Sequence, residues 1–87
     1  MSDDNYVWVF NGDTNMFPSA AFASLEEAEI WIAKCEAKGT LTKYPLGVSV
    51  YDWAISNQYF HPKTDEHTAS EFISNFSSAY LEHHHYE

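Results

Sequence analysis

The sequence contains no arginine and only four lysines, so basic side chains are too few for several kinds of binding. Proteins hold a nucleic-acid backbone with clustered lysine and arginine, and arginine is the residue that most often reads guanine. An anionic membrane surface attracts basic clusters for the same reason. The composition therefore predicts a protein that binds neither nucleic acid nor a membrane surface.

Cysteine is also scarce, because Cys35 is the single one in 87 residues. One thiol cannot form a disulfide within the chain, so no feature of the sequence requires an oxidising compartment. No window approaches the roughly 18 consecutive apolar residues of a membrane-spanning helix. The start, Met-Ser-Asp-Asp-Asn, is acidic where a secretion signal would be basic. We therefore expect a cytoplasmic protein.

Hydrophobic residues make up 45% of the chain and aromatic residues 17%, which is far from the composition of disordered proteins. A chain of this length has room for one compact core. We expect residues 1–87 to fold as a single domain.

Four segments have the composition of β-strands. The run Tyr-Val-Trp-Val-Phe at 6–10 ends in the turn-forming Asn-Gly-Asp and predicts a central strand. Residues 19–23 can return as its hairpin partner after a loop of roughly six to eight residues. Residues 40–44 predict a third strand, and residues 80–87 an edge strand or an extended end.

The clearest helix signal begins at Ser24, which forms a capping box with Glu27. The apolar positions that follow repeat with helical spacing: Leu25, Ala28, Trp31, Ile32 and Cys35. Gly39 supplies a stop, so we expect a helix over 25–38 with Leu25, Trp31 and Ile32 packed on the sheet. On this pattern Cys35 is a buried core thiol and not a nucleophile.

The second half of the chain predicts less regular structure. Residues 48–55 can start as a strand and end in a turn or short helix. A second capping box over 68–71 predicts a short helix that buries Phe72, Ile73 and Phe76. Together these elements predict an α+β fold, with a small antiparallel or mixed sheet of about four strands. One main helix and one short C-terminal helix would lie on one face.

The sequence contains no recognisable catalytic centre. It has no glycine-rich phosphate loop, no serine in a nucleophile elbow and no arginine to hold an oxyanion. Asp52 with His61 could form an acid/base pair, but an aspartate that accepts backbone hydrogen bonds is the favoured interpretation. We therefore predict that the protein is not an enzyme and has no cofactor.

Three consecutive histidines, His83 to His85, raise the question of a metal site. In a strand, residues two apart share a side, so His83 would lie beside His85, and His84 beside Glu82. Either pair lacks the three or four ligands of a dedicated site, so the sequence predicts none. The string also looks like the start of a purification tag, but it turns to Tyr86 and Glu87, so we treat it as native.

The net charge is −9, from 13 acidic residues against four lysines. A magnitude of about 2–8 suffices to keep a small domain soluble, and the excess would attract a basic protein. The aromatic residues exceed what one helix can cover, so some should be exposed and suited to an interface. The candidate partner-binding residues are Asp13, Tyr51, Asp52, Glu82 and Tyr86. The alternative is that the acidity only maintains solubility and the rings all pack inside.

Five segments resemble a small bacterial domain family of unassigned function: Tyr6–Gly12, Phe22–Ala28, Tyr51–Ala54, Phe76–Ala79 and Glu82–Tyr86. The resemblance covers nearly the whole chain and implies no activity. In size and acidity the chain is also similar to bacterial immunity proteins, which cover the basic grooves of toxic nucleases. That similarity implies an inhibitor of a basic partner such as a toxin domain. The alternatives are a non-inhibitory interaction module and a metal-binding protein with a histidine tail, and a homo-oligomer is compatible with each.

Overall fold

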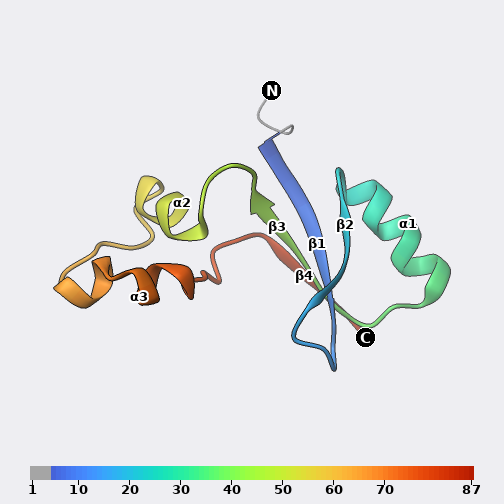
Figure 1. Ribbon diagram of the computed structural model, residues 1–87. Helices are drawn as coiled ribbons and strands as arrows, with labels where there is room; N and C mark the ends of the chain where they lie inside the picture. The colour runs from blue at the N-terminus through green and yellow to red at the C-terminus, as the bar shows by residue number, and fades with distance from the viewer. Residues whose placement is uncertain (1–4) are drawn as a thin grey trace.

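The computed structural model describes residues 5–87, which form an α+β fold around one sheet (Figure 1). The strands are β1 (Tyr6–Gly12), β2 (Pro18–Phe22), β3 (Gly39–Pro45) and β4 (His83–Tyr86). The helices are α1 (Leu25–Cys35), α2 (Val50–Ser56) and α3 (Ser70–Ser74), with a 3-10 turn, η2 (Asp65–Thr68). The strand order is β2-β1-β3-β4 and all neighbours are antiparallel, which confirms the predicted fold class.

β1 is a central strand, as its β-branched and aromatic sequence predicts. It pairs with β2 on one side and with β3 on the other, with Phe10 opposite both Ala20 and Leu41. The β2 strand confirms the predicted hairpin, although its loop over 13–17 is slightly shorter than expected. β4 confirms the predicted edge strand, because it pairs with β3 alone.

α1 begins where the capping box predicts. The Ser24 hydroxyl accepts a hydrogen bond from the Glu27 backbone N–H at 3.1 Å. The Glu27 carboxylate in turn accepts from the backbone N–H of Ala23 at 3.2 Å, one residue before the expected donor. The helix ends at Cys35 and not at residue 38, because Glu36 adopts the left-handed conformation (φ 54°) that closes the helix.

The prediction that Cys35 is a buried core thiol is wrong, because its side chain is exposed. Cys35 lies on the apolar stripe, but it is the last residue of α1, and Figure 1 shows this end of the helix lying away from the strands. The thiol instead donates a hydrogen bond to the Trp31 carbonyl at 3.1 Å.

The core between α1 and the sheet contains the predicted helix residues. Trp8, Phe10 and Leu41 from the sheet form a buried cluster with Ala28 and Ile32 from α1. Leu25 and Trp31 are half-buried against it, and the Trp31 ring centroid lies 5.5 Å from those of both Phe10 and Phe22. The packing of Leu25, Trp31 and Ile32 on the sheet is therefore confirmed.

The two faces of the sheet differ. The buried strand residues Trp8, Phe10, Gly39 and Leu41 all lie on the face that α1 covers. The opposite face contains Val7, Val9, Thr40, Thr42, Tyr44, His83 and His85, none of them fully buried. The expectation that all helices share one face is wrong, because α2 and α3 lie to the side of the sheet remote from α1 (Figure 1).

α2 is the short helix expected as one alternative for residues 48–55, but no strand precedes it within this segment. Ser49 caps a helix there, because its hydroxyl accepts from the Asp52 backbone N–H at 3.0 Å. α2 buries Tyr51, whose ring contacts those of Phe60, Phe72 and Phe76 at centroid distances of 5.5 to 6.4 Å. We call these four residues the second aromatic cluster, because the core beneath α1 also contains aromatic rings. The cluster gives the C-terminal half of the chain a small core of its own.

α3 is the predicted short helix, but its predicted cap is wrong. The residue before it is Ala69, which has no capping side chain, and the Thr68 hydroxyl donates instead to the Asp65 carbonyl at 3.0 Å. Phe72, Ile73 and Phe76 are half-buried, so the predicted inward face is present. Over residues 5–87, no helix combines the length and the apolarity needed to span a bilayer.

Candidate functional site

The outer face of α1 presents an exposed apolar side chain in acidic surroundings. Ala28 and Ile32 point into the core, and Ile30 lies between them on the opposite side of the helix. As a result Ile30 is 63% exposed. It borders an open hollow of about 540 Å³, which Leu25, Glu26, Glu29 and Ala33 also line. We call these five residues the α1 outer face.

The carboxylates of the α1 outer face, those of Glu26 and Glu29, form no ion pair with a lysine in the described part of the chain. Among residues 5–87 the one ion pair joins His84 Nε2 to the Glu82 carboxylate, at 3.1 Å. Lys43 lies over aromatic rings instead, 4.4 Å from the ring centroid of Tyr6 and 5.7 Å from that of Trp8. Glu26 and Glu29 are therefore available to an external cation.

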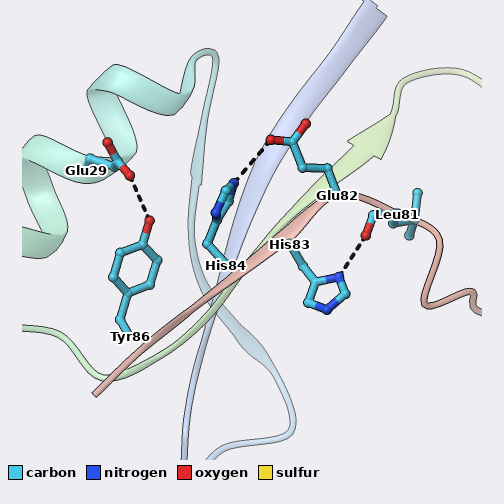
Figure 2. A network of polar contacts seen from close by, with 6 residues as sticks. All are labelled: Glu29, Leu81, Glu82, His83, His84 and Tyr86. Carbon is cyan, nitrogen blue, oxygen red and sulfur yellow. Dashed lines mark hydrogen bonds and ion pairs between the residues drawn. The ribbon is translucent and has the colours of Figure 1, made fainter.

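Glu29 is held in place from the sheet. The Tyr86 hydroxyl donates a hydrogen bond to its carboxylate at 3.0 Å, from β4 to α1 (Figure 2). Burial, followed by the hydrogen bond to Glu29 and the negative charge of Glu29, raises the pKa of Tyr86 above its ordinary value of 10.0. The phenol therefore stays protonated and continues to donate to at least the pH at which a free tyrosine ionises.

Two of the five predicted partner-binding residues lie close together. Asp13 and Tyr86 line a common hollow of about 390 Å³ at the end of the sheet, with Lys38, Gly39, Thr40, His85 and Glu87. Asp13 is exposed, and its backbone N–H donates to the Lys38 carbonyl at 3.1 Å. Since Tyr86 also contacts Glu29, this hollow lies next to the α1 outer face.

The other three predicted residues do not join this surface. Tyr51 is only 7% exposed, so the expectation that its ring lies on the surface is wrong. Its ring is in the second aromatic cluster, and its hydroxyl donates to the His67 carbonyl at 2.7 Å. Asp52 is exposed on α2, remote from α1 in Figure 1. Glu82 precedes β4 and accepts from His84 (Figure 2).

A family match covers residues 7–87, from the first strand through β4 to Glu87. The family is described as a domain of unknown function (DUF7710). The chain belongs to this family. No curated protein and no solved structure matches it. The DUF7710 match assigns no activity, and it includes both α1 and β4, which form the surfaces described above.

This DUF7710 domain also exposes aromatic side chains, as the sequence predicts. The rings of Tyr59 and Tyr80 stack with centroids 4.2 Å apart and an interplanar angle of 9°. Tyr59 is 45% exposed and Tyr80 is 66% exposed. The ring centroid of Trp53 lies 5.4 Å from that of Tyr59. This stack lies in the C-terminal half of the chain, apart from the α1 outer face.

Sequence reasoning overlooked Ile30, although a signal for it was present. The apolar stripe of α1 accounts for Leu25, Ala28, Trp31 and Ile32, and Ile30 falls outside that stripe. Ile30 lines the same hollow as Leu25 and Ala33, and contiguous apolar surface of this kind is what marks a candidate contact site.

Proposed function

We propose that this domain binds a basic protein partner and that the α1 outer face is its contact surface. The observation that carries the proposal is the 63% exposed Ile30 beside carboxylates that no lysine pairs with. Interfaces commonly combine an apolar contact at the centre with charged groups at the rim.

The charge of the chain supports a basic partner. With a net charge of −9, the domain attracts cations from beyond contact distance and repels acidic proteins. Such complementarity acts mainly on the rate of association and on the choice of partner. The bond from Tyr86 adds orientation, because Glu29 then presents its carboxylate in a fixed position.

A more specific form of the proposal is an inhibitor of immunity type, in which the acidic domain covers a basic groove of its partner, such as that of a nuclease. The support is the combination of small size, net acidity and an acidic helix face. The second candidate is an interaction module that binds without inhibiting. The exposed stack of Tyr59 and Tyr80 favours it, because this stack offers a contact surface on the other half of the chain.

The test begins with capture of proteins from the source cell by the immobilised full chain. An Ile30→Asp variant is the matched control, because it removes the apolar contact and adds one negative charge, so that a loss of binding cannot come from lost acidity. We expect a protein of high isoelectric point that binds the parent chain and not the variant. A neutral or acidic partner, or equal binding by both chains, would contradict the proposal.

A second measurement separates the two forms of the function. If the captured partner has nuclease activity, stoichiometric addition of the domain should abolish it. A partner that binds tightly and keeps its full activity identifies a non-inhibitory interaction module.

A further inference from the structure

The histidines of β4 form a close pair on the face of the sheet that α1 does not cover. His83 and His85 are both exposed, and their ring centroids are 5.1 Å apart with an interplanar angle of 85°. Figure 2 shows His83 on the opposite side of β4 from His84 and Tyr86. Two imidazoles that bind one tetrahedral Zn²⁺ at about 2.0–2.1 Å have centroids roughly 5 Å apart. The pair is therefore already spaced for a shared ion.

Hydrogen bonds leave the ligand nitrogen of each ring free. Nδ1 of His83 lies 2.7 Å from the Leu81 carbonyl oxygen. A carbonyl only accepts, so Nδ1 carries the proton, and in the neutral ring Nε2 is the nitrogen that has the lone pair. Nδ1 of His85 lies 3.2 Å from the Thr40 hydroxyl, which can accept from it in the same way. A second-shell bond of this kind, from the ring nitrogen that does not bind the ion, is the usual arrangement around zinc.

One chain supplies only half of a zinc site. Residues 5–87 contain no group of three or more histidine, cysteine or carboxylate side chains placed to hold an ion. A structural zinc ion takes four protein ligands. A site of this kind built on His83 and His85 would therefore need two further ligands from another molecule.

The position of β4 shows how a second copy can supply them. β4 is an edge strand, and the Glu82 carbonyl accepts from the Lys43 N–H at 2.9 Å, so residues of even number bond to β3. The N–H and C=O groups of His83 and His85 then point to the free edge. Antiparallel pairing of two β4 strands about His84 places His83 opposite the partner subunit's His85, and His85 opposite the partner subunit's His83.

This register brings four imidazoles together, because residues opposite each other in an antiparallel pair share a face. The metal is needed for the pairing. β4 has four residues, so the strand contact is short, and each copy carries a net charge of −9, which keeps copies apart. We propose that β4 is a zinc-dependent dimerisation strand in which one Zn²⁺ binds His83 and His85 of two chains.

The test uses the full chain, expressed without an added tag and stripped with EDTA. Analytical ultracentrifugation should give the 10.0 kDa monomer in EDTA and twice that mass with ZnCl₂. Calorimetric titration should give one Zn²⁺ per two chains. A mass unchanged by zinc, or one Zn²⁺ bound per chain without dimerisation, would overturn the proposal.

Variants assign the ligands. His83→Ala with His85→Ala should abolish the zinc-dependent mass change. His84→Gln, on the same strand but the opposite face, should retain it. Circular dichroism in EDTA checks that the variants fold. If the double variant does not fold, NMR of the parent chain decides. Zinc should then shift the ring resonances of His83 and His85 and leave those of His61 and His67 in place, and the reverse pattern would refute the site.

Discussion

The hydroxyl of Tyr86 donates a hydrogen bond to the carboxylate of Glu29 at 3.0 Å, across 57 positions of the sequence. It connects the edge strand β4 to the helix that carries the exposed Ile30 (Figure 2). Tyr86 also packs against the core beneath α1. The bond therefore couples the end of the chain to the proposed contact surface, and its removal should have measurable effects.

The first prediction concerns stability. Tyr86→Phe removes the donor and keeps the ring, so the free energy of unfolding should fall by about 0.5–1.5 kcal/mol. The matched control is Tyr80→Phe, whose side chain is 66% exposed and should change stability by no more than about 0.5 kcal/mol. Urea unfolding monitored by circular dichroism measures both. Equal effects of the two substitutions would show that the bond to Glu29 does not contribute.

The second prediction concerns pH. The pKa of Tyr86 is raised in the folded chain, so above the ordinary value of 10.0 the folded state binds more protons than the unfolded state. Stability from this group is therefore fully present below about pH 10 and is lost as the pH rises through the folded pKa. In urea unfolding, the parent chain should therefore lose its extra free energy of unfolding relative to Tyr86→Phe as the pH rises above about 10. If the difference in free energy of unfolding between the parent chain and Tyr86→Phe grows as the pH rises above about 10, the predicted direction of the pH effect is wrong.

Sequence reasoning succeeded where structure depends on neighbouring residues. The start of α1 is decided by a contact between Ser24 and Glu27, three residues apart, and the pattern identifies it directly. The strand at β1 is similarly decided by its unbroken β-branched and aromatic run.

The sequence did not predict the features that depend on contacts between residues far apart in the chain. Cys35 satisfies the apolar spacing, but the helix leaves the sheet before the core can cover it. Tyr51 resembles a surface aromatic in sequence, and it is buried because Phe60, Phe72 and Phe76 fold back onto it. The contact between Tyr86 and Glu29 depends on β4 pairing with β3, which no local pattern reveals.

The third prediction tests the close approach of β3 to β1. A Cβ atom at Gly39 would overlap the backbone carbonyl of Asn11, whereas a Cβ atom at Gly12 would meet nothing within 4 Å. Gly39→Ala should therefore cost about 1–3 kcal/mol of stability, because the backbone must shift to relieve the overlap. Gly12 is the residue opposite Gly39 in the sheet, so Gly12→Ala is the matched control. Its free energy of unfolding should stay within about 0.5 kcal/mol of the parent value. Thermal unfolding of both variants distinguishes the positions.

The fourth prediction separates the two sides of α1. Trp31 is half-buried against Phe10 and Phe22, so Trp31→Ala should cost about 3 kcal/mol, the lower end for a core tryptophan. Ile30→Ala should leave stability within about 0.5 kcal/mol, because Ile30 contributes little to the core. Comparable losses in urea unfolding for the two substitutions would place Ile30 in the packing and remove it from the contact surface.

The fifth prediction concerns the kinetics of the proposed complex with a basic partner. Glu26 lies at the edge of the hollow beside Ile30 and forms no ion pair, so Glu26→Gln should lower mainly the association rate. Ile30→Ala should raise mainly the dissociation rate, because it removes an apolar contact that forms only in the complex. Surface plasmon resonance at two salt concentrations measures both rates.

Salt separates these two effects further. Screening limits the field of the domain to roughly 8 Å at physiological ionic strength, so association of the parent chain should slow steeply as salt is added. Dissociation should change much less. Glu71→Gln, in α3 and away from the α1 outer face, removes the same formal charge and serves as the control for net charge alone. If Glu71→Gln slows association as much as Glu26→Gln does, net charge and not the α1 outer face steers the partner. An association rate indifferent to salt would remove the electrostatic basis of the proposal.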